Sequence, residues 1–265
     1  MQAGRQRFFR AVAALLVSSL SFLFRCDSAG AQTNLQLWGN VTIDWQKVDR
    51  LTYAVDLEPK VLLTAPAGDP EWATVDVTPK VDYAARRWLD LTGELLAGYT
   101  AQTNDVNSVE LTPRAGVRFH LFSRAVPVRI AGHVNRDREL PPKRRLVLRD
   151  YVRVEWRNLF YSDDTDNSST GRLRNRIELL FPLNRALMTN DGARYLMADW
   201  EWFIPFTDVS ERFANKQRVR TGVGWRRSRD WRFEALGVWD RSRHTISDGF
   251  TTSDYAMSVQ VKRVF

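Results

Sequence analysis

The sequence has very little cysteine and histidine, which limits the chemistry open to it. It contains one cysteine, Cys26, and three histidines in 265 residues. A single cysteine cannot form an intramolecular disulfide, so no disulfide framework is available to staple the fold. Scattered histidines without a cysteine partner also lack the ligand spacing of a zinc site. We therefore expect no metal site and no cofactor.

Long hydrophobic runs are missing as well. Beyond the first 25 residues, no uninterrupted apolar stretch reaches the roughly 18 residues that a membrane-spanning helix requires, and the mean hydropathy is −0.38. This excludes a helical membrane protein. A soluble domain and a β-barrel stay open, because the lipid-facing residues of a barrel alternate with polar ones.

The amino-terminal segment predicts export. Arg5, Arg7 and Arg10 precede an apolar stretch at 11–24, and Ala29-Gly30-Ala31 supplies the small residues of a cleavage site. We expect residues 1–31 to be a signal peptide that is removed, and residues 32–265 to be a single domain. The alternative is a buried amino-terminal helix.

The charge of the chain gives no argument for nucleic-acid binding. The net charge is +8, and it falls to +5 when residues 1–31 are removed. Such a modest charge, spread along the chain, differs from the clustered basic face that nucleic acid favours.

From Leu35 onward the chain repeats one pattern, in which apolar and polar residues alternate over about ten positions before a turn. This period of two is typical of β-strands with one apolar face. About twelve strands are expected, at 35–46, 51–64, 74–83, 89–102, 109–121, 126–135, 146–157, 172–181, 196–204, 218–226, 231–240 and 254–265. The mature chain is therefore predicted to be all-β.

Alternation alone does not separate a β-sandwich from a β-barrel, but three features favour the barrel. Charge is dense on the polar face, and aromatic residues lie near the strand ends of the apolar face, as in the two interfacial girdles of a membrane barrel. The chain also ends in an amphipathic strand that resembles the assembly signal of bacterial outer-membrane barrels. The residues of this expected signal are Tyr255, Val259, Val261 and Phe265. We predict an antiparallel, up-and-down transmembrane barrel, with an even strand number and both ends in the periplasm.

Three short segments share the order acid, apolar, any residue, proline, base. They are 56–60, 76–80 and 110–114. Proline cannot donate to a ladder, so each segment predicts a bulge, an edge or a local distortion. The acid and the base lie on the polar face, where they can pair across strands. The alternative is hairpin duplication without a function.

Several spaced motifs together resemble one bacterial family. They are Arg149-x-x-x-Arg153-x-Glu155-x-Arg157, Arg172-x-Arg174-x-Arg176 leading to Pro182-Leu183, Glu201-x-Phe203, Arg218-x-Arg220-x-Gly222-x-Gly224, and the terminal Phe265. The series resembles the outer-membrane family known as domain of unknown function 2490. The resemblance implies an outer-membrane barrel of a Gram-negative bacterium, with outer-membrane lipid and the barrel-assembly machinery as partners. It implies no catalytic residue.

A catalytic triad is not indicated. Some outer-membrane barrels are lipid hydrolases, but none of His120, His133 and His244 has a serine two residues later. The acidic stretch 163–166 lacks the glycine and the later glutamate of an EF-hand. We expect a protein that is not an enzyme, and an outer-membrane lipid hydrolase is the alternative.

The polar face itself carries the remaining chemistry, because it is rich in arginine. The chain has 33 arginines and 6 lysines. The charged residues expected to face the lumen are Arg114, Arg118, Arg153, Glu155, Arg157, Arg172, Arg174, Arg176, Glu178, Asp199, Glu201, Arg218, Arg220 and Arg226. Guanidinium binds carboxylates in a planar, bidentate way. The sequence thus leaves open a narrow anion-preferring channel for small acidic solutes and a structural barrel braced by ion pairs. A soluble periplasmic β-sandwich that binds a ligand is a third alternative.

Overall fold

A computed structural model of the chain describes residues 33–48, 50–64, 71–103, 106–121, 146–164, 166–185, 187–206, 216–242 and 252–265. By its contacts the chain divides into two units, Met1–Ala31 and Gln32–Phe265. The predicted signal peptide and the expected strand at 126–135 lie outside the described residues. Within them, no helix is long and apolar enough to cross a membrane.

The described residues form eleven strands, each an alternating segment of the sequence. They are β1 (Thr33–Val48), β2 (Leu51–Thr64), β3 (Trp72–Arg86), β4 (Leu89–Gln102), β5 (Ser108–His120), β6 (Val147–Tyr161), β7 (Ser168–Pro182), β8 (Ala193–Pro205), β9 (Lys216–Arg226), β10 (Trp231–Ser242) and β11 (Thr252–Val264). β6 is longer than expected, because the alternation continues with Leu159 buried and Phe160 exposed.

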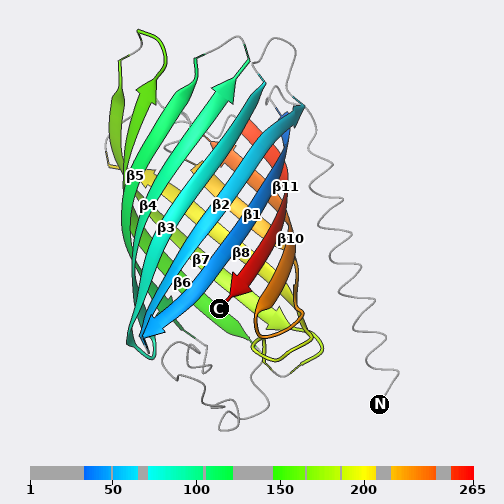
Figure 1. Cartoon of the computed structure of the whole chain (residues 1–265). Helices are drawn as coiled ribbons and strands as arrows, with labels where there is room; N and C mark the ends of the chain where they lie inside the picture. Colours follow the sequence, from blue (N-terminus) through cyan, green and yellow to red (C-terminus); the bar gives the residue numbers. More distant parts are fainter. Residues whose placement is uncertain are drawn as a thin grey trace. The chain divides into compact units, whose positions relative to one another are not determined.

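The strands close into one barrel in chain order (Figure 1). Every neighbouring pair is antiparallel except β1 and β11, which run parallel from Thr33↔Ser253 to Asp44↔Val264. This corrects the expectation of twelve strands that are all antiparallel. A closed ring of this kind also excludes the two-sheet sandwich.

The physical reason for the correction lies between β5 and β6. These strands pair directly, from Ser108↔Tyr161 to His120↔Arg149, so no strand stands between them. Ten antiparallel steps lead from β1 to β11, and an even number of such steps makes the first and last strands run in the same direction. The barrel therefore has a Phe265 end, where β11 finishes, and a Thr33 end, where β1 begins. The turns at 49–50, 87–88 and 227–230 all lie at the Phe265 end.

Side chains alternate between the interior and the outer wall. In β8, Tyr195 and Glu201 are buried, whereas Trp200 and Ile204 are 45% exposed on the wall. Exposed aromatic residues lie near both ends of the wall. Examples are Trp45, Tyr83, Trp88 and Trp225 toward the Phe265 end and Tyr99, Trp156 and Phe160 toward the Thr33 end.

The three prolines of the repeated segments each interrupt one ladder. Pro59 falls in a gap of the β1–β2 register, Pro79 in a gap of β3–β4, and Pro113 in a gap of β5–β6. Each proline is nevertheless paired on its other side, for example Val55↔Pro79 between β2 and β3. All three are exposed on the outer wall. The predicted distortion is therefore a missing pair on one side of each proline.

Candidate functional site: the charged interior

All the charged residues that the sequence assigns to the lumen lie on the inward-facing side of their strands. They come from β5 to β9, where they alternate with wall residues such as Val154 and Ile177. The four residues of the terminal strand lie on the opposite face, where Val259 is 44% exposed and Phe265 is 63% exposed. The interior is therefore the candidate site.

Glu155 on β6 lies where the ion pairs of the interior converge. Its side chain has 0% exposure, and its carboxylate oxygens lie 2.8 Å from Arg153 Nε, 2.6 Å from Arg172 Nε, 2.8 Å from Arg174 Nη1 and 3.3 Å from Arg114 Nε. These arginines come from β5, β6 and β7, whose register places them around Glu155. One carboxylate thus holds four buried cations from three adjacent strands.

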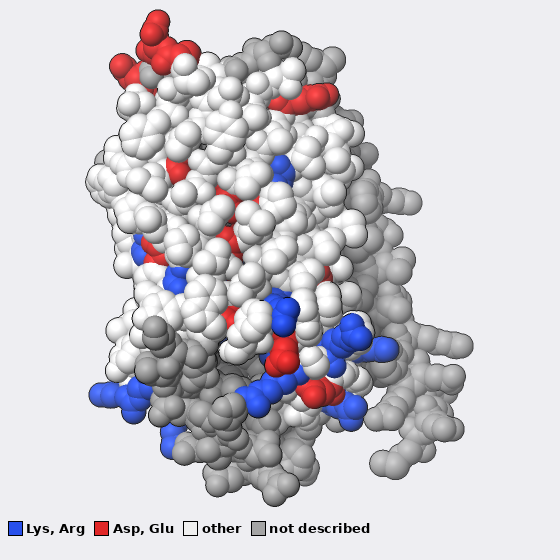
Figure 2. Space-filling model, in the orientation of Figure 1, with Lys and Arg blue, Asp and Glu red and all other residues white. Residues whose placement is uncertain are grey.

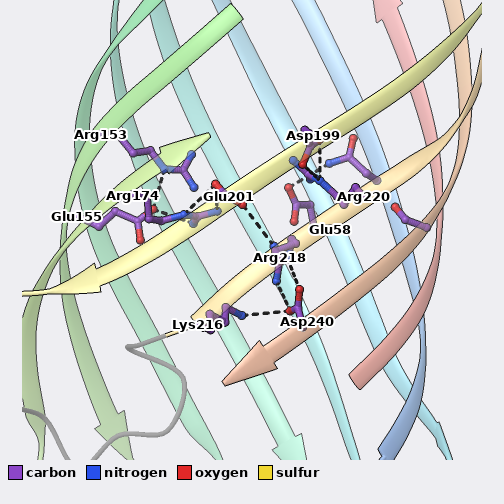
Figure 3. Close-up of polar contacts among 12 residues, drawn as sticks. Glu58, Arg153, Glu155, Arg174, Asp199, Glu201, Lys216, Arg218, Arg220 and Asp240 are labelled. Atoms are coloured by element: carbon purple, nitrogen blue, oxygen red, sulfur yellow. Dashed lines mark hydrogen bonds and ion pairs between the residues drawn. The ribbon is translucent and has the colours of Figure 1, made fainter. Parts of the chain in front are cut away.

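The ion pairs continue from β7 to β10 (Figure 3). Arg174 lies between Glu155 and Glu201, and its Nη2 donates to Glu201 Oε1 at 2.7 Å. Arg218 Nη1 is 3.9 Å from the other Glu201 oxygen, while its Nε and Nη2 donate to Asp240 at 2.7 and 2.8 Å. Arg220 Nε donates to Asp199 at 3.0 Å.

The repeated segments supply further ion pairs of the interior, between β2 and β3. Lys60 Nζ donates to Asp76 at 2.6 Å, and Lys80 Nζ donates to Asp56 at 2.7 Å. The acid and base of the first segment therefore pair reciprocally with those of the second, as the polar-face interpretation of the repeat predicts. In the third segment, Arg114 instead joins the group around Glu155.

Most inward-facing cations of the described strands are paired in this way. Each inward lysine or arginine has a carboxylate oxygen within 4.0 Å, apart from Arg176 and Arg226. Arg176 lies over the Tyr151 ring at 5.5 Å, and Arg226 Nη1 donates to the Arg229 carbonyl at 3.0 Å. The arginine rows therefore carry little uncompensated charge.

Rings and apolar side chains fill part of the interior. The Phe203 ring is 3% exposed, and the guanidinium of Arg174 lies 4.2 Å from its centroid. On the strand side that faces inward, Leu180, Met197 and Leu236 form an apolar cluster with Tyr195, whose hydroxyl donates to Glu234 at 2.5 Å. Gly224 leaves room for this ring, because a Cβ there would lie 2.1 Å from Tyr195 Cζ.

One histidine takes part in the interior network. His120 Nε2 lies 3.0 Å from Asp90 Oδ2, and its side chain is 8% exposed. Among the described residues, no serine or threonine hydroxyl forms a hydrogen bond with this pair. His133 and His244 lie outside them. In the same part of the chain, no group of three histidine, cysteine, aspartate or glutamate residues is placed to hold a metal ion.

Several interior residues were missing from the sequence-based site. Glu94 accepts from Tyr151 at 2.9 Å and from Arg153 at 3.2 Å, and Asp240 holds both Arg218 and Lys216. Strand parity contained the signal for them, because Glu94 lies in the alternation Thr92-x-Glu94-x-Leu96. Their partners could not be found in this way, because they depend on the register of strands distant in sequence.

The fold and interior define a class, namely a closed β-barrel with an apolar wall and an ion-paired interior. Residues 35–250 match the family described as Protein of unknown function (DUF2490), so the chain belongs to this family. No curated protein matches the chain. Among solved structures, LpxR from Salmonella typhimurium is similar with a TM-score of 0.48 and 9% sequence identity, over 84% of this chain and 87% of that chain.

Proposed function

We propose that the protein is a transmembrane barrel of a Gram-negative outer membrane. The support is the apolar wall with aromatic residues near both ends, the pattern that a lipid-facing barrel requires. The closed ring also leaves no unpaired sheet edge in the hydrocarbon, apart from the local gaps at the prolines. The expected signal peptide and terminal strand fit delivery by the barrel-assembly machinery.

We further propose that the barrel is closed and non-conducting, and that its role is structural. The observation that carries this proposal is Glu155, which is fully buried among four arginines. Such pairing holds the side chains across the interior and leaves little net positive charge to attract anions. It therefore favours the braced barrel over the anion-preferring channel.

A planar-bilayer recording tests this proposal. We expect no steady conductance from protein whose migration on electrophoresis changes on boiling, which shows that it has folded. Charge reversal by Arg174→Glu and Arg220→Glu distinguishes the two roles. In a channel these changes shift selectivity toward cations, whereas in the closed barrel they reduce folding. Steady anion-selective current from the natural protein would overturn the closed barrel.

The lipid-hydrolase alternative has less support. A hydrolase of this type needs a nucleophile and a base on the same side. The His120–Asp90 pair provides a base and an orienting carboxylate, but the described residues place no hydroxyl against it. Loss of a hydrolytic activity on phospholipid in His120→Ala would restore this alternative.

A further inference from the structure

Exposed charge is unevenly distributed between the two ends of the barrel. The turns at the Phe265 end carry exposed Arg50, Arg86, Arg87, Arg185, Arg227 and Arg229, against exposed Asp191 and Asp230. The described connections at the Thr33 end carry exposed Glu71, Asp163, Asp164 and Asp166. On the face shown in Figure 2, arginine and lysine gather toward the lower end and acidic residues toward the upper edge. The modest net charge therefore conceals a basic end.

Two further arginines, Arg194 and Arg263, lie on the outer wall at this basic end, near aromatic residues. Arg194 is exposed between the inward-facing Ala193 and Tyr195, and it stands opposite Trp225 in the β8–β9 register. Trp225 and Phe233 have ring centroids 5.8 Å apart. The net charge of the sequence does not reveal this arrangement.

The second arginine, on β11, completes the surface. The guanidinium of Arg263 lies 5.1 Å from the Trp231 ring and 4.2 Å from the Phe265 ring, and Trp231 is 6.1 Å from Phe233. We name the six residues Arg194, Trp225, Trp231, Phe233, Arg263 and Phe265 the wall patch. Within the described residues, neither of its guanidinium groups forms an ion pair or a hydrogen bond.

We infer that the wall patch binds the phosphate groups of anionic phospholipids in the leaflet at the Phe265 end, an inference that rests on the proposed insertion into a membrane. Arginine forms strong, bidentate hydrogen bonds with phosphate oxygens. Tryptophan rings at the end of a lipid-facing wall lie at the depth of the headgroups. An arginine at the same level of the wall as such rings therefore meets phosphate rather than hydrocarbon.

The position of the patch favours lipid over a soluble polyanion. A soluble polyanion needs only the exposed turns, whereas Arg194 and Arg263 lie on the wall itself, on the same face as Val223 and Val261. The aromatic rings near them pack against the lipid next to its headgroup, and the guanidinium groups bind the phosphate of that headgroup. The turn arginines add positive potential to the same surface.

Lipid selectivity at the protein wall provides the test. The full mature protein is placed in phosphatidylcholine vesicles with spin-labelled phosphatidylglycerol or spin-labelled phosphatidylcholine, and electron paramagnetic resonance separates lipid held at the wall from free lipid. We expect wall-held phosphatidylglycerol to be favoured about two- to fivefold, since one basic residue at an anionic surface accounts for roughly a fivefold preference. Raising the salt from 0.1 M to 1 M should reduce it, because the Debye length falls from about 10 Å to about 3 Å.

Variants locate the preference. Arg194→Gln with Arg263→Gln should bring the two lipids to near parity, and each single change should have a smaller effect. Arg241→Gln is the matched control, because Arg241 also lies over a tryptophan ring but near the Thr33 end, where its guanidinium donates to Gln217 at 2.7 Å. It should leave the preference unchanged.

The outcomes separate this inference from the function on which it rests. Wall-held lipid without preference for phosphatidylglycerol overturns the inference and leaves the membrane barrel standing. A preference that survives in the double variant overturns it too. Absence of any wall-held lipid removes both proposals. If the double variant does not fold, the single variants and the salt dependence of the natural protein decide.

Discussion

Charge compensation in the interior depends on individual carboxylates. Arg153, Arg172 and Arg174 each lie within 2.8 Å of Glu155, and their side chains are at most 10% exposed. Buried guanidinium groups have lost most of their hydration, and the carboxylate takes the place of that water. Removing the carboxylate therefore lowers the free energy of unfolding strongly. Arg174 has a second partner in Glu201, at 2.7 Å, whereas Arg172 Nε lies 2.6 Å from Glu155 itself. The effect of losing Glu155 therefore spreads over several strands.

We predict that Glu155→Gln lowers the free energy of unfolding by about 3 to 5 kcal/mol, the cost of leaving a buried charge without its partner. Urea unfolding of the vesicle-inserted barrel measures it. Glu178→Gln is the control, because Glu178 is 15% exposed and its Arg149 partner is 30% exposed. Equal losses in the two variants would contradict the central role of Glu155.

The sequence largely predicted which face of its strand each residue occupies. It did not predict which residues pair with one another. Alternation assigned Arg172, Arg174 and Arg176 to the interior because a period of two fixes the face of every position in a strand. The same alternation could not show that, among the described residues, Arg174 has two carboxylate partners while Arg176 has none within 4.0 Å. That difference arises from neighbouring strands and from side-chain reach across the interior.

At the scale of the strand, the wall is defined by parity, and one substitution pair tests it. Val259 is 44% exposed on β11, and Gln260 next to it faces inward opposite Glu234. If Val259 lies near the bilayer midplane, Val259→Arg should cost about 2 to 4 kcal/mol. Gln260→Arg should be mild, because the new charge meets Glu234. Unfolding in vesicles compares the two, and similar costs would show that the assigned faces are wrong.

Strand boundaries were predicted well where alternation was uninterrupted. The number of strands was not predicted correctly. The segments at 51–64 and 89–102 coincide with β2 and β4. The apolar residues at 126–135 also alternate, but membership of a barrel is decided by pairing, and β5 and β6 pair with each other. The local sequence pattern does not show which strands pair with one another.

At the scale of the whole molecule, the strand number decides how the barrel closes. A barrel of twelve antiparallel strands would begin and finish at the same end. Eleven strands instead join β1 to β11 in parallel, with Phe265 N donating to Asp44 O at 2.8 Å beside the last register pair. The ion pair of Lys262 with Asp44 crosses the same seam. Closure therefore separates the beginning of β1 from the end of β11 by the full length of the barrel.

This geometry predicts which inserted tags lie on the same side of the membrane. Tags on the same side should be equally accessible to an external protease. A cleavable tag before Thr33 should behave like a tag in the β6–β7 connection at 162–167, because both sites lie at the Thr33 end. A tag in the β9–β10 turn at 227–230 lies at the Phe265 end and should behave oppositely. Intact cells treated with protease measure the comparison, and the absolute orientation of the barrel need not be known. If the tag before Thr33 instead followed the β9–β10 tag, the ring would contain one more strand, and the parallel seam between β1 and β11 would be wrong.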